Sequence, residues 1–462
     1  KVVPYIATEE GITKILEEFK SKSIGDEISA ALEEINQTTL KIEETHQDIT
    51  DETLRDAPVA RIVNMILETA VKIGASDVHL EPGEDKSRLR YRVDGILEEK
   101  RTFPKEMHDS ISARVKILSN MKIDEKRIPQ DGRFKIQVGD TSTDLRVSTL
   151  PTIYGEKVVI RLLKEEGVIF SFKDLGLRGL SLKRLETAIL KPTGMILVTG
   201  PTGSGKTVTL SAALSKLNTA RVNIVTVEDP VEIRVNGVNQ VQVNVQAGLT
   251  FATGLRSFLR QDPNIILVGE VRDGETAELA IHAALTGHLV LSTLHTNSAA
   301  GAIPRLLDMG VEDFLLSSTL VAVLGQRLVR KVCTQCKEEY EPPKEVQDQI
   351  RETLKDIEQN KVIMTKDPDI AKNMKLLKQD KLTLYKGKGC DLCHQTGYKG
   401  RLGIFELLEM SEKIAHLTVE RSPANAIEDV AISEGMVKLI QDGFLRALEG
   451  TTTIEEVMRV AK

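Results

Sequence analysis

The stretch MILVTGPTGSGKTVTL, residues 195–210, decides how the larger part of this chain folds. Residues 200–207, GPTGSGKT, fit the phosphate-loop pattern, with a buried strand expected before them and a helix after them. Glycines let the backbone curl so that amide groups face a phosphate, and the helix N-terminus adds positive potential. We expect Lys206 to contact the β- and γ-phosphates and Thr207 to hold Mg²⁺. The predicted phosphate-binding residues are Gly200, Pro201, Thr202, Gly203, Ser204, Gly205, Lys206 and Thr207.

Apolar segments alternate with predicted helices around this loop, from about residue 178 to residue 330. Strands are expected where short apolar runs are bounded by Gly or Asp, and helices are expected from Lys206 and near residues 275–285. This order is typical of a doubly wound parallel sheet, so the predicted fold class of the region is α/β. The expected strands have the sequences MILVTG, NIVTVED, NIILVGE and HLVLSTL.

Acidic residues follow two of these strands. In NIILVGEVRD, residues 264–273, Gly269 stands where the usual metal-binding aspartate would be, and Glu270 follows it. We predict that Glu270 orients or deprotonates the attacking water. The missing aspartate leaves Glu228 and Asp229, at the end of a neighbouring strand, to help with the metal. The alternatives are a surface carboxylate for Glu228 and a helix N-cap for Asp229.

Two histidines lie at the ends of the strand HLVLSTL. His288 opens this segment, and His295 follows it beside Thr296 and Asn297. Ligands of such sheets bind at the carboxyl edge, so we expect His295 to sense the γ-phosphate. His288 is a second candidate catalytic residue, and a structural histidine with its hydrogen bonds satisfied is the alternative for it.

A smaller α+β domain is expected at residues 56–165. Apolar residues at helical spacing begin at Pro58 and continue until a glycine ends the helix. In RLRYRVDGILEE, alternating apolar residues precede an Asp-Gly turn, which indicates a hairpin. Residues 166–177 are the predicted hinge to the next domain. Residues 1–55 are interpreted as the remnant of an N-terminal docking region and linker, and since the chain opens on lysine we expect a fragment of a longer protein.

The four cysteines of the chain form two CxxC pairs, KVCTQCKEE at residues 331–339 and GCDLCHQTG at residues 389–397. Two such pairs offer four thiolates in the geometry of a closed tetrahedral zinc site. Disulfides would suit a secreted protein, and a redox CxxC would not require a second pair. We predict a zinc-binding insert with little core of its own at residues 331–400, followed by a helical region at residues 401–462. The predicted zinc ligands are Cys333, Cys336, Cys390 and Cys393.

Composition narrows the classes of protein to consider. The 462 residues suggest about three domains at about 150 residues each. The net charge of -6 provides no overall positive field that would gather nucleic acid. No apolar run approaches the roughly 18 to 20 residues needed to cross a bilayer. We therefore expect a soluble protein that does not bind nucleic acid.

Taken together, the motifs GPTGSGKT, VEDPVE, ILVGEVRD and TGHLVLSTLHTN, in this order behind SDVHLEP and IPQDGRF, resemble those of the secretion ATPases of type II secretion and type IV pilus systems. The similarity runs from about residue 56 to the C-terminus. It implies a RecA-like core that uses ATP and Mg²⁺, with Zn²⁺ in the cysteine insert, and a homo-hexameric ring. It also implies that Arg133 and Arg146 of the small domain reach the nucleotide. Solvated arginines on a strand face are the alternative.

The resemblance also implies a function. The chain would be a cytoplasmic motor that hydrolyses ATP at the cytoplasmic face of the inner membrane and drives assembly of pilin-like subunits. Its partners would be an inner-membrane platform protein and a cytoplasmic docking protein, through which it would associate peripherally with the membrane. Pilus assembly and type II secretion both stay open, because both use this core. A nucleic-acid translocase would need a basic channel with aromatic residues, and an inactive scaffold would not need Glu270, Lys206 and Thr207 together.

Overall fold

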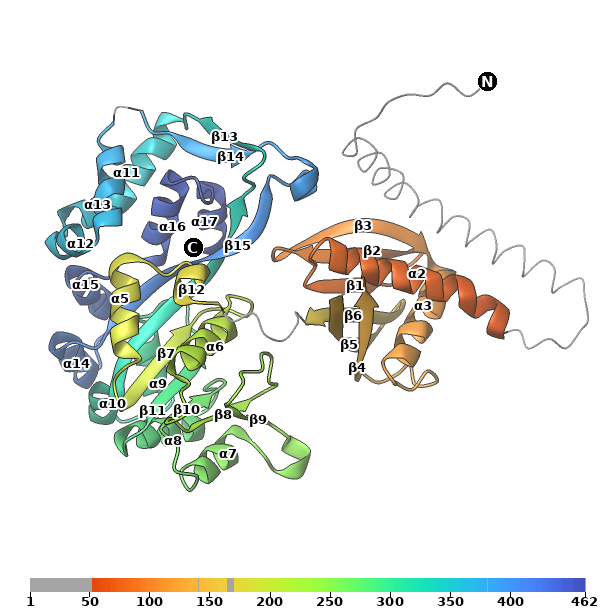
Figure 1. Cartoon of the computed structure of the whole chain (residues 1–462), viewed down its shortest axis with the longest axis horizontal. Helices are drawn as coiled ribbons and strands as arrows, with labels where there is room; N and C mark the ends of the chain where they lie inside the picture. Colours follow the sequence, from red (N-terminus) through yellow and green to blue (C-terminus); the bar gives the residue numbers. More distant parts are fainter. Residues whose placement is uncertain (1–51, 140, 164–169, 380, 462) are drawn as a thin grey trace, which may run out of the picture. The chain divides into compact units, whose positions relative to one another are not determined.

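The structure is a computed structural model that describes residues 52–139, 141–163, 170–379 and 381–461. It divides into two compact units, Lys1–Glu165 and Glu166–Lys462, which we call the N-terminal unit and the C-terminal unit (Figure 1). The predicted remnant at residues 1–55 lies outside the described residues, apart from residues 52–55. Among the described residues, no helix combines the length and apolar character that crossing a membrane requires.

The N-terminal unit is an antiparallel sheet with two helices packed on one face. Its strand order is β3-β2-β1-β6-β5-β4. Alternate residues of a strand face the same side, so the apolar residues of these strands form one core with the helices. The predicted hairpin is confirmed, since Asp94 and Gly95 join β2 to β3 with φ values of 48° and 87°. The elements are α2 (Glu52–Lys72), β1 (Asp77–Glu81), β2 (Lys86–Val93), β3 (Ile96–Pro104), α3 (Lys105–Leu118), β4 (Gln130–Val138), β5 (Thr141–Thr152) and β6 (Gly155–Leu163).

The first helix starts earlier than the sequence indicates. The spacing of apolar residues predicts a start at Pro58, and proline, which lacks an N–H group, is best tolerated in the first turn of a helix. In the structure α2 begins at Glu52 and Pro58 lies inside it. Its end agrees with the prediction, because Gly74 follows with φ 69°.

The face of this sheet that points away from α2 and α3 carries a row of arginines. The register places Arg133 opposite Arg146, and Arg146 opposite Arg161. Leu145 and Val147, on either side of Arg146, are buried in the core, so Arg146 faces the other way. The sheet therefore holds Arg133 and Arg146 side by side on one polar face.

The C-terminal unit is built on a seven-stranded sheet of order β15-β12-β7-β11-β10-β8-β9. Neighbouring strands from β12 to β9 are parallel, and β15 pairs with β12 in the antiparallel direction. The predicted α/β fold and the four predicted strands are confirmed. The strands are β7 (Gly194–Thr199), β8 (Ile224–Glu228), β9 (Asn239–Gln242), β10 (Ile265–Val268), β11 (Leu289–Leu294), β12 (Leu320–Val332) and β15 (Tyr398–Glu409).

Helices cover both faces of this sheet, which makes it doubly wound. Met195 of β7 belongs to one core cluster and Ile196 to the other, as expected for a strand buried on both sides. The first cluster includes residues of α7 (Phe251–Phe258), α8 (Gly274–Leu285), α9 (Ala302–Asp308), α10 (Asp313–Thr319), α14 (Glu412–Val419) and α15 (Ala424–Ser433). The second includes residues of α4 (Phe172–Leu175), α5 (Gly179–Ala188) and α6 (Lys206–Leu217).

The insert that carries the cysteines shares a core with the C-terminal helices. Ile350, Leu354 and Ile357 of α11 are buried in the same cluster as Phe444 and Leu445 of α16. The insert therefore has more apolar support than the sequence indicated, and Figure 1 shows its helices beside α16 and α17. The elements of this region are β13 (Lys337–Tyr340), α11 (Lys344–Gln359), α12 (Lys361–Lys366), α13 (Pro368–Leu377), β14 (Leu384–Gly387), α16 (Leu439–Leu448) and α17 (Ile454–Val460).

Two predicted boundaries differ from the structure. The second half of the hinge predicted at residues 166–177 belongs to the C-terminal unit, because Phe172 of α4 is buried in its core. Residues 166–169 lie outside the described residues. The region predicted to be helical from residue 401 begins with a strand, because β15 completes the sheet beside β12. The pairing partner of β15 is far away in sequence, so local pattern did not indicate it.

Candidate active site and metal centre

The phosphate loop connects β7 to α6 as predicted. Its glycines adopt backbone conformations that other residues rarely adopt, and two of them have no room for a side chain. Gly200, Gly203 and Gly205 have φ values of 148°, 80° and 90°. A Cβ atom on Gly200 would lie 2.6 Å from the carbonyl oxygen of Gln326, and one on Gly205 would lie 2.9 Å from the Gln326 Nε2 atom. The loop is therefore formed against β12, and larger residues at these two positions would clash with it.

Lys206 begins α6, and its side chain is folded back over the loop. The Nζ atom donates hydrogen bonds to the carbonyl oxygens of Gly200 at 2.8 Å and Pro201 at 3.1 Å. Burial lowers the pKa of the Lys206 ammonium; the carboxylate of Glu270 opposes this change and the guanidinium of Arg327 adds to it. Lys206 is thus held near both an acid and a second cation.

The loop also has the features of an anion cradle. The side-chain oxygens of Ser204 and Thr199 are buried without a hydrogen-bond partner among the described residues. Buried hydroxyl groups without partners cost free energy, and a phosphate oxygen would accept from them. The glycine geometry, the helix N-terminus and these hydroxyls fit the phosphates of a nucleotide. Thr207 lies in the first turn of α6, and its binding of Mg²⁺ stays a prediction.

Glu270 lies just beyond the carboxyl end of β10. Its Oε1 atom accepts a hydrogen bond from Arg272 Nη2 at 2.6 Å, and its Oε2 atom lies 3.4 Å from His295 Nε2. Gly269 is explained by space: a Cβ there would lie 3.2 Å from both the Glu228 Cα atom and the Val227 oxygen. The approach of β8 is close, so its backbone would have to give by a few tenths of an ångström to accept a side chain at this position.

Glu228 is the last residue of the neighbouring strand β8 and Asp229 follows it, but the two have different surroundings. Glu228 is buried, and its Oε1 atom accepts from Thr226 Oγ1 at 2.6 Å and Gln240 Nε2 at 3.0 Å. Burial raises the pKa of the Glu228 carboxyl, and these two hydrogen bonds oppose the rise. Glu228 is therefore not the surface carboxylate of the alternative interpretation. Asp229 is exposed and precedes Pro230 rather than a helix, so it is not an N-cap.

The two histidines lie at opposite edges of the sheet. His295 follows β11 at the carboxyl edge, as predicted, where it meets Glu270. His288 precedes β11, and a six-residue strand separates the two by about 20 Å. The His288 Nδ1 atom lies 2.8 Å from the Ala283 carbonyl oxygen. Within one chain His288 is therefore remote from the phosphate loop, and its position fits the alternative of a hydrogen-bonded structural residue.

Arg133 and Arg146 belong to the N-terminal unit, on the row described above. Their contact with a nucleotide stays a prediction.

Residues of β12 that the motif analysis missed complete the surroundings of the loop. Gln326 Oε1 accepts from Thr209 Oγ1 of α6 at 2.8 Å, and the Arg327 guanidinium donates to the Asn297 carbonyl oxygen at 2.7 Å. A signal was present in the sequence, because the polar pair interrupts the apolar run LVAVLGQRLV. Only the pairing of β12 with β7 places that pair at the phosphate loop.

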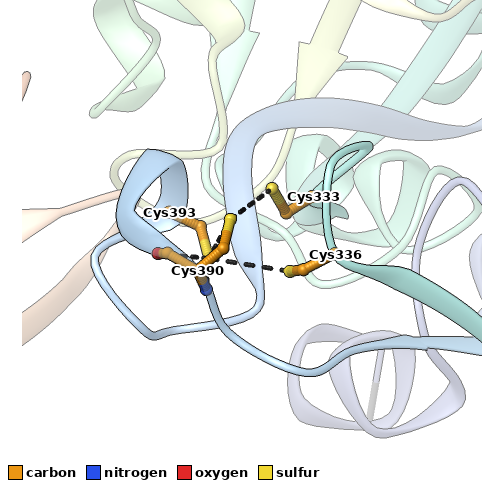
Figure 2. A group of neighbouring side chains, drawn as sticks. All are labelled: Cys333, Cys336, Cys390 and Cys393. Carbon is orange, nitrogen blue, oxygen red and sulfur yellow. Dashed lines mark hydrogen bonds between the residues drawn. The ribbon is translucent and has the colours of Figure 1, made fainter. Parts of the chain in front are cut away.

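The four cysteines converge as predicted (Figure 2). The Sγ atoms of Cys333 and Cys390 are 3.7 Å apart, and those of Cys336 and Cys393 are 3.8 Å apart. Four sulfurs at a Zn–S distance of 2.3 Å in a tetrahedron would be about 3.8 Å apart, so this donor set fits zinc. Burial alone would raise the pKa of Cys393, but hydrogen bonds from the Cys390 and Gly397 amides help lower it to about 6. Burial instead raises the pKa values of Cys336 and Cys390, so the amide hydrogen bonds favour the thiolate form at Cys393 in particular.

Comparison with known proteins gives relatives that cover most of the chain. It is 44% identical over 460 residues to the type IV pilus assembly ATPase PilB of Thermus thermophilus, covering 99% of this chain and 48% of that protein. It is 47% identical over 416 residues to the type II secretion system protein E of Xanthomonas campestris, covering 89% of this chain and 69% of that protein. The chain thus spans about half the length of the Thermus relative.

Two solved structures show a fold similar to that of this chain. The pilus retraction motor PilT with bound ADP matches with a TM-score of 0.54 and 25% identity, over 86% of this chain and 96% of that one. The ATPase DotB of Legionella pneumophila matches with a TM-score of 0.59 and 19% identity, over 86% and 95% of the two chains, which shows a shared fold. The model of the Type II/IV secretion system protein family matches residues 52–459. The chain belongs to this family and carries its P-loop ATPase core.

Proposed function

We propose that this chain is the core of a homo-hexameric motor that hydrolyses ATP to ADP and phosphate and so drives assembly of type IV pili or type II secretion pseudopili. The observation that carries the proposal is the meeting of Glu270 and His295 at the edge of the sheet where the phosphate loop lies. A carboxylate and a histidine beside a phosphate loop are suited to hydrolysis rather than to nucleotide storage.

The chemistry assigned to these residues is as follows. Lys206 and the loop amides bind the β- and γ-phosphates, while Thr207, Glu228 and Asp229 would hold Mg²⁺. Bound Mg²⁺ would neutralise charge on the phosphates. Glu270 accepts a proton from water as the water oxygen attacks the γ-phosphorus and the bond to the bridging oxygen breaks. His295 contacts the γ-phosphate and so senses its presence or loss.

The remaining parts of the proposal concern assembly and partners. Arg133 and Arg146, in the N-terminal unit, supply positive charge to the nucleotide of the same or a neighbouring chain of the ring. The motor works at the cytoplasmic face of the inner membrane, where a platform protein and a cytoplasmic docking protein attach it. Nucleic acid is not a substrate, in keeping with the net charge of -6.

The test combines activity with partner capture. Purified chain should release phosphate from ATP, and Lys206→Ala should abolish this. In a strain that lacks the native protein, the full-length wild-type protein should restore pili or secretion. It should also copurify with the inner-membrane platform protein. The full-length Lys206→Ala variant should restore neither pili nor secretion. Absence of hydrolysis in every assembly state would support an inactive scaffold. Stimulation of hydrolysis by DNA, without platform capture, would support a translocase instead.

A further inference from the structure

Arg327 is a buried cation beside the phosphate loop that none of the four site motifs contains. It is 7% exposed and lies on β12, just beyond the last pair between β12 and β7, Gly325 with Thr199. A Cβ atom added to Gly200 would lie 3.2 Å from Arg327 Nη1. The guanidinium therefore lies against the first residue of the loop.

The same guanidinium bonds to the segment that carries His295. Its Nη2 atom donates to the Asn297 carbonyl oxygen at 2.7 Å, and its Nη1 atom donates to the Gln326 carbonyl oxygen at 3.0 Å. Asn297 is two residues beyond His295. A planar guanidinium fixes both direction and distance at two acceptors, which a lysine would not do.

Glu406 of β15 holds the far end of this segment. Its Oε1 atom accepts from the Ala299 amide at 2.6 Å, and its Oε2 atom accepts from the Leu439 amide at 3.2 Å. Burial lowers the pKa of Arg327 and raises the pKa of Glu406, and the charge of each residue opposes the shift of the other. Residues 297–299 are thus attached at one end to β12 and at the other to β15. The His295 side chain, at the start of the segment, is itself 48% exposed, so packing alone does not fix its direction.

We propose that Arg327 is a positioning residue for ATP hydrolysis, because it fixes the segment after β11 against the phosphate loop and so holds His295 at Glu270. The inference rests on the proposed function in that the reaction is ATP hydrolysis. Arg327 acts through His295 rather than on the substrate. Its loss should therefore lower kcat much more than it changes the affinity for ATP.

The first test is a double-mutant cycle. Arg327→Gln should lower kcat about 10- to 100-fold, as small misplacements of catalytic groups do, with ATP affinity changed less than about threefold. Arg327→Lys should recover only part of the loss. In a His295→Ala background, Arg327→Gln should have little further effect on kcat. A loss of kcat that multiplies fully with that of His295→Ala, or an unchanged kcat in Arg327→Gln, would overturn the inference.

The control separates positioning from general support of the fold. Arg330 lies three residues further along β12 and bonds to Glu456 at 2.6 Å, away from Asn297. Arg330→Gln should lower the unfolding temperature but leave kcat close to that of the wild type.

The second test does not depend on hydrolysis, so it separates this inference from the proposed function. Amide hydrogen exchange in residues 295–301 should be faster in Arg327→Gln than in the wild type or in Arg330→Gln. Equal exchange in all three proteins would overturn the positioning role even in an active motor. Faster exchange in a protein that hydrolyses ATP but captures no platform protein would leave the positioning role intact and reject the proposed function alone.

Discussion

The His295 Nε2 atom lies 3.4 Å from the Glu270 Oε2 atom, although each residue follows a different strand. The contact arises because β10 and β11 are adjacent and parallel, so the residues beyond their carboxyl ends meet at one edge. Arg272 bonds to the other carboxylate oxygen of Glu270 at 2.6 Å. The carboxylate is thereby held between two nitrogen-bearing side chains near Lys206.

Glu270→Gln should lower the turnover of ATP by at least about 100-fold with little loss of ATP affinity, because the amide cannot accept a proton from water. Steady-state phosphate release and equilibrium nucleotide binding measure the two effects. Glu275→Gln is the matched control, since Glu275 is exposed at the start of α8 and pairs with Arg256. Equal losses of binding and turnover in Glu270→Gln would remove Glu270 from the proposed role.

The cysteine cluster should hold about one zinc ion per chain, measured by elemental analysis of the purified protein. Cys390→Ser should reduce the zinc content and destabilise residues 331–400, since such sites contribute about 10 kcal/mol or more to folding. The phosphate loop between β7 and α6 should still bind ATP in the Cys390→Ser variant.

The matched control for the zinc site is His394→Asn. His394 is next to Cys393 with φ 49°, a conformation that asparagine tolerates, and it is not one of the four clustered donors. The zinc content of the His394→Asn variant should equal that of the wild type. Protein that contains no zinc and four titratable thiols would contradict the prediction.

Arg133→Ala and Arg146→Ala should each depress turnover while zinc content and thermal unfolding stay unchanged. Arginines that reach a transferred phosphate raise the rate of phosphoryl transfer by about 10³- to 10⁵-fold. Arg133 and Arg146 lie opposite each other on the paired strands β4 and β5. Lys135→Ala is the control, because Lys135 lies two residues along β4 and is 70% exposed. Phosphate release per chain should also rise with protein concentration in the wild type, as expected if neighbouring chains cooperate.

A truncation tests the same prediction independently of the point variants. Residues 166–462 form a compact unit with its own core, so they should bind ATP but hydrolyse it poorly. Full activity of this unit, or of the double arginine variant, would mean that the active site is complete without the N-terminal unit.

Glu456→Gln should destabilise the C-terminal unit at pH 7 by about 2–3 kcal/mol, because Glu456 bonds to Arg330 and Arg459. Burial would raise the pKa of Glu456, but these bonds lower it from 4.5 to about 2. A depressed pKa contributes stability above pH 4.5 that is lost as the pH falls towards 2. The difference in unfolding temperature between wild type and variant should therefore be constant at neutral pH and shrink below pH 4.5.

Acid also protonates the cysteines, which would change the stability of the protein independently of Glu456. A control variant must therefore be measured at each pH. Glu455→Gln serves as this control, since Glu455 is the exposed neighbour of Glu456 on α17. A difference between wild type and Glu456→Gln that persists unchanged at pH 3 would show that the ion pair does not carry the effect.

Local pattern was sufficient for the phosphate loop, the parallel strands and the Asp94-Gly95 hairpin. Each depends on residues close in sequence: glycines with positive φ, apolar runs long enough to cross a sheet, and a turn that only certain residues adopt. Matched CxxC pairs likewise indicated their convergence, because a tetrahedral site needs four donors. The positions of Glu270 and His295 followed from the rule that parallel strands end at one edge.

Tertiary structure decided what lies against these elements. Pairing of β12 with β7 brings Gln326 and Arg327 to the phosphate loop, and pairing of β15 with β12 brings Glu406 to the segment after His295. The close approach of β8 makes Gly269 a tight position for a side chain, and β11 separates His288 from the edge where the loop lies. These contacts join residues that are remote in sequence. Their free energy comes from burial and hydrogen bonds that form only in the folded sheet, so a local sequence pattern does not predict them.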